Sequence, residues 1–270
     1  MVSAQITAPP LIPLRFKAEK WDKIIYLGRA IHDSLLHCVL SFDGRLNDNI
    51  LNKAFRLSLD AEPVLGCRFV DKSRQPYWER KKDLDREGRV DIAEVNDAMQ
   101  AALEYMVKPI DPCDGPQVQA RLFRAKRDTL CLKINHMVAD AGGVKEYIYL
   151  LSSIYRQLEK DPSYIPEVNS AGSRSRMQVV QHFIFWDKVK IVRRSFRDWK
   201  EAYFPVGNWS VPLQHLTQSQ KTYVIRKIEL QQFRVVRQYC KKYGVTVNDI
   251  MMAAMYVLFI KCFNHHPKYH

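Results

Sequence analysis

A strand pattern, a short loop and a helix pattern follow one another directly in the middle of the chain. Residues 129–135 (TLCLKIN) form an apolar run typical of a strand. The loop after it, HMVADAGG, ends in two adjacent glycines. Beyond the loop, apolar residues recur at the spacing of a helix with one buried face, at Val144, Tyr147, Ile148, Leu151, Ile154, Tyr155 and Leu158. This junction predicts an α/β fold.

The remaining patterns extend this prediction along the chain. They indicate strands at 36–42, 64–70, 77–80, 117–125 and 222–229, and helices at 47–59, 96–107, 177–201, 231–243 and 246–262. The polar turn 126–128 joins the predicted strands 117–125 and 129–135 as a hairpin. The Pro- and Ser-rich stretch 159–176 indicates a linker. The last helix is so apolar that we expect it to be largely buried. The predicted fold class is a mixed, largely antiparallel sheet flanked by helices.

Composition excludes several protein classes. With 47% hydrophobic residues the chain is not globally disordered, and no apolar stretch reaches the roughly 20 residues of a membrane span. The N-terminus lacks the basic start and continuous apolar centre of a secretory signal, so a cytoplasmic location is expected by default. The six cysteines show neither a CxxC pair nor a zinc spacing, which predicts no disulfide framework and no metal site: Cys38, Cys67, Cys113, Cys131, Cys240 and Cys262.

The net charge of +13 is concentrated around the predicted helix 177–201. A basic region like this could meet nucleic acid, anionic lipid, an acidic carrier protein or a phosphorylated cofactor, or could simply be a solvated face. The apolar side of the helix has two interpretations, packing on the rest of the chain or peripheral contact with a membrane. Helices 231–243 and 246–262 superficially resemble a helix-turn-helix, but the run IMMAAMYVLFI offers almost no groups to base edges. We therefore expect no nucleic-acid binding.

The candidate site lies in the junction, where His136 and Asp140 form an H-x-x-x-D spacing. A motif of only two residues can occur by chance, so the position of this one at the end of a strand is the stronger indication. A side chain at the end of a strand projects beyond the sheet, a common position for catalytic groups. An imidazole can accept and return a proton near neutral pH, and Asp140 could cap the helix or fix the loop. The alternative is a structural histidine beside a helix cap.

Several ordered landmarks resemble the chloramphenicol-acetyltransferase-like superfamily of acyltransferases, which includes condensation domains and alcohol acyltransferases. The family motif H-H-x-x-x-D-G matches at His136 and Asp140, while Asn135 replaces the first His and Ala141 replaces the Gly. Gly142 and Gly143 follow immediately. Similar landmarks lie at 40–69, 110–123 and 222–255. The chain is therefore identified as a member of this superfamily.

The resemblance implies a first lobe at 1–165, a linker with the basic helix at 166–221 and the beginning of a second, similar lobe at 222–270. It implies transfer of an acyl group from acyl-coenzyme A or an acyl-pantetheine on a carrier protein to an alcohol or amine, with a weak preference for an alcohol. His136 would be the general base, supported by Asn135, Gly142 and Gly143. Asp140 would be structural and would pair with Arg68 or, failing that, Arg121. It implies neither a metal nor a permanently bound cofactor.

The sequence ends at His270, before the strands that would complete a second lobe and before the family's Asp-Phe-Gly-Trp-Gly box. In this family substrates enter a tunnel between the two lobes. Two expectations therefore remain open. A second chain could complete the tunnel of an active acyltransferase, or the lobe could be a catalytically inert scaffold that binds a partner.

Overall fold

The computed structural model describes residues 12–29, 33–71, 75–169, 181–203 and 223–264. The chain divides into two compact units, Met1–Thr222 and Tyr223–His270, and each is described by itself. The predicted α/β class with mixed sheets is confirmed in the first unit.

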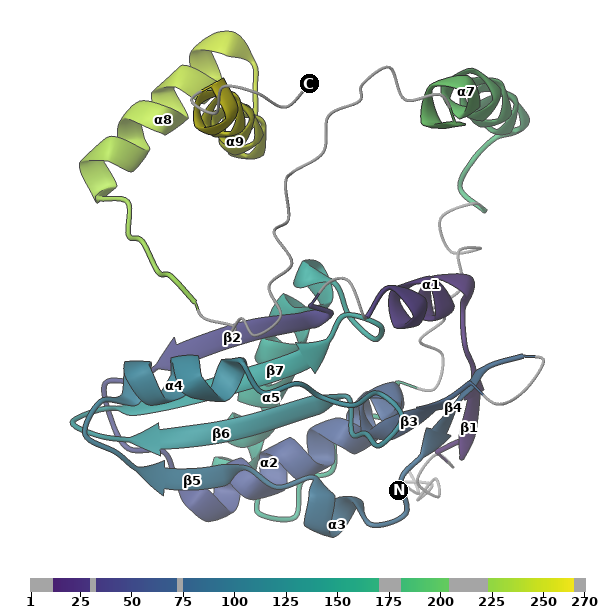
Figure 1. The fold of residues 1–270 in the computed structure, drawn as a ribbon. Helices are drawn as coiled ribbons and strands as arrows, with labels where there is room; N and C mark the ends of the chain where they lie inside the picture. The colour runs from purple at the N-terminus through teal and green to yellow at the C-terminus, as the bar shows by residue number, and fades with distance from the viewer. Residues whose placement is uncertain (1–11, 30–32, 72–74, 170–180, 204–222, 265–270) are drawn as a thin grey trace, which may run out of the picture. The chain divides into compact units, whose positions relative to one another are not determined.

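A four-stranded sheet forms the centre of the first unit (Figure 1). Its order is β2 (Leu35–Ser41), β7 (Asp128–Asn135), β6 (Val118–Arg124) and β5 (Asp91–Glu94). The central strand β7 pairs antiparallel with both neighbours, and β5 pairs parallel with β6. The predicted hairpin is thus confirmed as β6 and β7, whereas the short strand β5 was not predicted.

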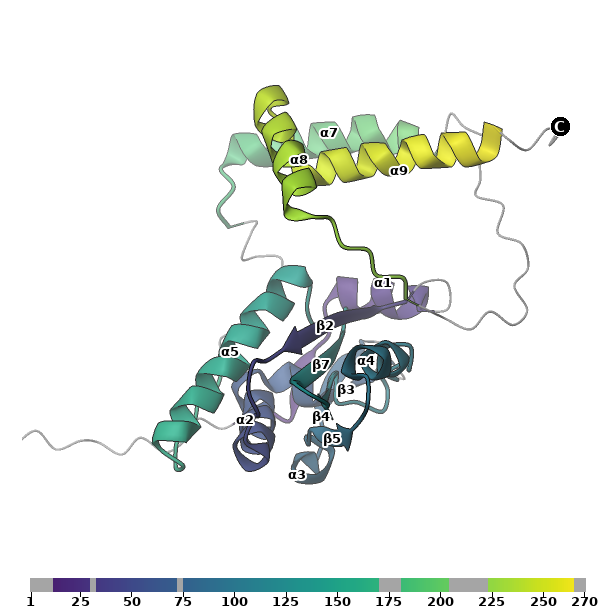
Figure 2. The ribbon, with the colours of Figure 1, turned by 90° about the vertical axis from the view of Figure 1, so that its left-hand side faces the viewer.

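The two faces of this sheet carry different helices (Figure 2). Helices α2 (Asp48–Ala61) and α5 (Ala141–Lys160) cover one face and bury the main apolar core, and α4 (Ala98–Met106) lies on the other. Strand alternation explains the division, since Leu130, Leu132 and Ile134 of β7 point into the core beneath α2 and α5. The residues between them, including Lys133, face α4.

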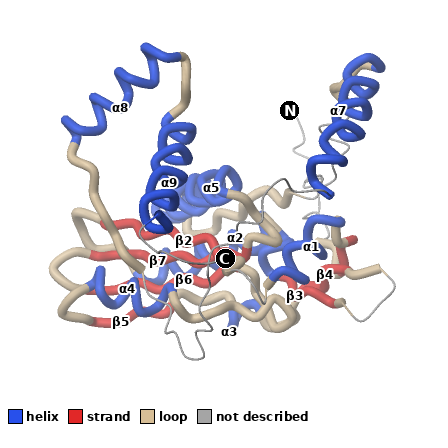
Figure 3. Tube along the Cα trace, turned by 45° about the horizontal axis from the view of Figure 1, so that its top comes forward, coloured by secondary structure: helices blue, strands red, loops and turns tan. Residues whose placement is uncertain are grey.

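A second, three-stranded sheet stands apart from the first and is drawn in red beside α1 in Figure 3. Its order is β1 (Arg15–Lys17), β4 (Tyr77–Arg80) and β3 (Cys67–Val70). Helix α1 (Lys20–Gly28) docks on it through Asp22, whose buried carboxylate accepts a 2.9 Å hydrogen bond from the Trp78 indole. Neither β1 nor α1 was predicted.

Two local boundaries differ from the sequence patterns in this region. The predicted strand 64–70 begins instead with a 3-10 turn, η1 (Pro63–Gly66), because proline restricts the backbone there. The charged stretch after β4 contains the short helix α3 (Leu84–Glu87), which was not predicted.

The basic helix α7 spans Phe185–Tyr203. The predicted start at 177 lies outside the described residues, and residues 181–184 are not helical. Asp187 lies in the first turn of the helix, where its carboxylate complements the positive end of the helix dipole. Both interpretations of its apolar side stay predictions. On the helix taken by itself the apolar side chains are exposed: Phe185, Trp186, Val189, Ile191, Val192 and Phe196.

The second unit contains helices α8 (Leu230–Tyr243) and α9 (Val247–Asn264), joined through Gly244 at φ +64°. The predicted strand 222–229 is not formed by the described residues 223–229, which have no partner strand in this unit. The expected burial of α9 is not tested by this unit alone and stays a prediction. Its apolar residues are distributed around the whole helix, and α8 alone leaves most of them exposed, including Met251, Met255, Tyr256, Leu258 and Ile260.

Among the described helices, none is by itself long and apolar enough to cross a membrane. The pair α8 and α9 passes that test of length and composition only when taken together, across a bend of 104°.

Gly115, in the loop before β6, has no room for a side chain. Its φ is +55°, and a Cβ there would lie 2.5 Å from the Cys67 carbonyl oxygen. We expect Gly115→Ala to lower the free energy of unfolding by about 2–3 kcal/mol, since both strain and overlap oppose the side chain. Urea denaturation measures this. Gly44→Ala is the matched control, because a Cβ there meets nothing within 4 Å. Equal stabilities of the two variants would contradict the prediction.

Candidate active site

The junction loop, residues 136–140, connects β7 to α5 and presents His136. The backbone N–H of His136 donates to the Ser34 carbonyl at 2.7 Å, which ties the loop to the start of β2. The Asn135 side chain is buried and accepts from the Met137 N–H at 3.0 Å. The His136 side chain itself is exposed and forms no hydrogen bond with a described residue. The backbone is thus held from both sides while the imidazole stays available to a reactant.

Asp140 caps α5 at its N-terminus. Its backbone is extended, and its carboxylate accepts from the Gly143 N–H at 2.8 Å. A Cβ at Gly142 would lie 3.3 Å from the Asp140 carboxylate, so the glycine leaves room for this cap. Ala141 is the first residue of α5, a position that suits alanine. The turn therefore forms without the glycine that the family motif has there.

The cap predicts a stability effect of moderate size. We expect Asp140→Ala to lower the free energy of unfolding by about 1 kcal/mol, because the Gly143 N–H loses its acceptor. Asp140→Asn keeps an acceptor oxygen and should lose less than half as much. Urea denaturation of both variants tests this, and an equal loss in both would show that the charge and not the cap stabilises the loop.

The expected pairing of Asp140 with Arg68 or Arg121 is not found among the described residues. Arg68 lies directly opposite Glu79 in the β3–β4 register and binds its carboxylate at 3.0 and 2.7 Å. Arg121 lies opposite Asp91 in the β5–β6 register and approaches it to 3.8 Å. Each arginine therefore pairs with its cross-strand neighbour, which is the nearest acid that the sheet supplies.

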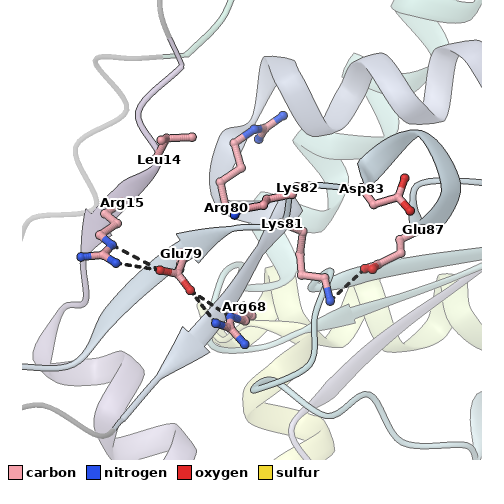
Figure 4. Close-up of a pocket in the computed structure, with 9 residues that line it drawn as sticks. All are labelled: Leu14, Arg15, Arg68, Glu79, Arg80, Lys81, Lys82, Asp83 and Glu87. Atoms are coloured by element: carbon pink, nitrogen blue, oxygen red, sulfur yellow. Dashed lines mark hydrogen bonds and ion pairs between the residues drawn. The ribbon is translucent and has the colours of Figure 1, made fainter.

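A basic cavity of about 850 Å³ lies on the three-stranded sheet (Figure 4). In it the carboxylate of Glu79 lies between the guanidinium groups of Arg15 and Arg68. Its other lining residues come from β4 and the segment after it: Arg80, Lys81, Lys82, Asp83 and Glu87, with Leu14 on β1's side. No residue of the junction loop lines this cavity. It is therefore separate from the candidate site.

A second cavity, of about 360 Å³, adjoins the junction loop, and we call it the junction cavity. Asn135 and Met137, the two neighbours of His136, line it, together with the wall segment 109–113. The other lining residues are Ile25, Tyr26, Arg29, Asp33, Ser34 and Leu35. The exposed histidine thus lies between two residues that border a space large enough for part of a substrate.

Tyr26 and Cys113 meet across this cavity, with 3.4 Å between the hydroxyl oxygen and the sulfur. The hydrogen bond to Cys113, together with burial, raises the pKa of Tyr26 to about 12. The phenol is therefore protonated near neutral pH. The Arg29 guanidinium lies 3.7 Å from the centre of the Tyr26 ring.

Sequence patterns did not point to Tyr26 and Arg29, because α1 was not predicted. Glu19 and Asp22, three residues apart, form a capping box that marks the start of α1 and was the available signal. Nothing in the sequence marks Gln117 either. Its buried amide donates to the carbonyls of Cys67 at 2.9 Å and Pro112 at 3.0 Å and so ties β3 to the end of the wall segment.

The model of the Condensation domain family matches residues 29–267, which is most of the chain. The chain belongs to the Condensation domain family. Its site residues His136 and Asp140 fall within the matched range. No curated protein matches the sequence.

Solved structures agree on the condensation-domain fold. The first condensation domain of the CDA synthetase superposes with a TM-score of 0.64 at 16% identity, over 93% of this chain and 61% of the other. SgcC5 from Streptomyces globisporus gives 0.59 at 12% identity, over 86% and 54%. The epimerization domain from the third module of tyrocidine synthetase B gives 0.54 at 16% identity, over 76% and 48%. The chain thus spans about three fifths or less of the length of these structures, and at such identities they show the fold alone.

No group of three or more His, Cys, Asp or Glu side chains is arranged to hold a metal ion within the described ranges. The chemistry that these residues can provide is proton transfer by His136, beside a preformed cavity.

Proposed function

We propose that this condensation-domain chain takes part in acyl transfer from a thioester to an alcohol or amine, with His136 as the general base. The observation that carries the proposal is the exposed imidazole of His136, which lies between the buried residues Asn135 and Met137 at the border of the junction cavity. A base must reach the proton it removes, and a fixed backbone with a free ring satisfies that requirement.

His136 alone can carry the proton through both steps of the reaction. A ring nitrogen of His136 accepts the proton of the acceptor's O–H or N–H group as the acceptor oxygen or nitrogen attacks the thioester carbonyl. The tetrahedral intermediate collapses, the carbon–sulfur bond breaks, and the thiolate leaves with the proton that His136 returns. The products are an ester or amide and a free thiol. Asp140 supports this chemistry through the loop and the start of α5, without contact to the ring.

Family membership favours a carrier protein as the source of the acyl group. Condensation domains make amide or ester bonds between substrates held on acyl carriers. Acyl-coenzyme A has the same pantetheine thioester and is the second candidate donor. Both alcohols and amines remain candidate acceptors, because a fold that also serves an epimerization domain does not select the reaction.

A partner-completed lobe without activity of its own is the second candidate function. Within the unit Tyr223–His270, α8 leaves apolar side chains of α9 uncovered, among them Met251, Tyr256 and Leu258, and this favours it, because such a surface is typical of an interface. Only the acyltransferase would convert substrate to product.

Product analysis by mass spectrometry distinguishes them. The chain is incubated with an acyl-carrier or acyl-coenzyme A donor and with an equimolar mixture of an alcohol and an amine. We expect one ester or amide per thiol released, and the product identifies the acceptor class. Thiol release without an acylated product, or no release with either donor, would leave the inert lobe as the better account.

A further inference from the structure

A lysine ammonium group lies inside the first unit, between the four-stranded sheet and α4. Lys133 is on β7, three residues before His136, and this residue is only 1% exposed. Its Nζ donates to the Lys108 carbonyl at 2.9 Å and lies 4.1 Å from the centre of the Tyr105 ring. No described carboxylate pairs with it.

A histidine from the neighbouring strand makes a parallel contact. His37 on β2 is directly opposite Lys133 in the register, and its Nε2 donates to the Met106 carbonyl at 3.0 Å. Met106 is the last residue of α4, where carbonyl groups have no partner within the helix. Cations are also favoured at this end of a helix dipole. Two basic side chains from adjacent strands therefore hold the carboxyl end of α4 onto the sheet.

The backbone that these contacts hold continues directly into the wall of the junction cavity. Residues 109–113 follow Lys108 and line that cavity. At the far end of the wall segment, the Pro112 carbonyl accepts from the Phe69 N–H at 2.7 Å and from the Gln117 amide at 3.0 Å. The wall is thus held at both ends, by Lys133 at its beginning and by β3 and Gln117 at its end.

We propose that Lys133, together with His37, is a positioning residue for the candidate site, which holds the Lys108 carbonyl so that residues 109–113 keep their place beside the His136 loop. Lys133 does not touch the reacting atoms. It acts through the wall segment. The structural part of this proposal does not depend on the proposed function, and only its effect on turnover does.

The surroundings of Lys133 support a role for its charge. The groups that face it are the Tyr105 ring and Lys108 from the α4 side, Cys131 on its own strand and His37 on β2, with Arg121 of β6 on the other side of Tyr105. None of these is an anion at neutral pH. Burial therefore lowers the pKa of Lys133 to about 8, and the ammonium is stabilised by a carbonyl and a ring alone.

The test is a short pulse of iodoacetamide at pH 7, with alkylation of each cysteine followed by peptide mass spectrometry. Cys113 reports the wall, whereas Cys67 and Cys131 are fully buried and report global opening. We expect Lys133→Met to raise the alkylation rate of Cys113 about fivefold, because the wall loses one hydrogen bond, with no change at the two buried cysteines. Lys145→Met is the matched control, since Lys145 also lies near a tyrosine ring, at 5.6 Å, but is exposed.

A second pair of variants keeps the proposal testable if Lys133→Met does not fold. His37→Leu removes the other donor and should also raise Cys113 alkylation, whereas His37→Gln retains an N–H donor and should restore a rate near that of the wild type. An unchanged Cys113 rate in Lys133→Met and His37→Leu would overturn the proposal. So would an equal rise at Cys67, Cys113 and Cys131, because it would show a loss of overall stability.

Turnover provides a separate readout. If the chain transfers acyl groups, Lys133→Met should raise the KM for the acceptor more than it lowers kcat, because a displaced wall weakens binding before chemistry. Absence of turnover in the wild type would refute the proposed function and leave the alkylation result to decide the role of Lys133.

Discussion

Replacing His136 by alanine is expected to lower acceptor-dependent thiol release by about 10²–10⁴-fold, the usual contribution of a general base. The imidazole is exposed, and the loop is held by its backbone and by Asn135, so the free energy of unfolding should change by less than about 0.5 kcal/mol. Free thiol is followed with a chromogenic reagent, and stability is followed by urea denaturation. A large loss of rate in a protein of unchanged stability is the signature of a catalytic side chain.

His182→Ala serves as the control, because His182 is also exposed but lies outside the junction. It should retain the wild-type rate. If His136→Ala loses less than about threefold, a proton acceptor other than His136 carries the reaction. If His136→Ala loses rate and stability together, the histidine is mainly structural.

Replacing Lys133 by methionine is expected to change how stability depends on pH. In the folded protein burial lowers the pKa of Lys133 to about 8, whereas an exposed lysine in the unfolded chain titrates near 10.5. Between these values the unfolded chain binds more protons, so the stability of the wild type rises with pH relative to the variant. The difference should grow by about 2 kcal/mol between pH 7 and pH 9.5 in favour of the wild type.

Denaturation curves of both proteins at several pH values measure this difference. Titration of tyrosines and other groups affects both proteins alike and cancels. Lys145→Met should run parallel to the wild type, because the Lys145 side chain is exposed. A constant difference between wild type and Lys133→Met across this range would mean that Lys133 is not a buried ammonium.

The core of the candidate site could be predicted from sequence because its signals are local. The apolar run of β7 and the helical spacing that begins at Val144 define the junction and place His136 at the end of a strand. A helix cap was one of the two roles that sequence indicated for Asp140, since a cap depends only on the next three residues.

The partners of the arginines could not be predicted, because they depend on strand register. Arg68 binds Glu79 and Arg121 approaches Asp91 only because β3 with β4, and β5 with β6, align these residues. β5 was itself not predicted. Alternation along one strand gives the face of a side chain but not its neighbour on the next strand.

Burial was the other property that sequence did not determine. Lys133 lies within an apolar strand pattern that gives no indication of a buried charge, and its role follows from the position of α4. For α9 the burial that its apolar composition favours stays a prediction. Burial requires a neighbouring surface, and the unit Tyr223–His270 by itself supplies only α8.

The most direct test of the account compares thiol release and acylated product in wild type and His136→Ala, each with and without acceptor. The account predicts that wild-type release depends on the acceptor, yields one ester or amide per thiol and is lost in His136→Ala. Release that is independent of the acceptor, or equal in the two proteins, would contradict the assignment of the junction loop as the site of acyl transfer.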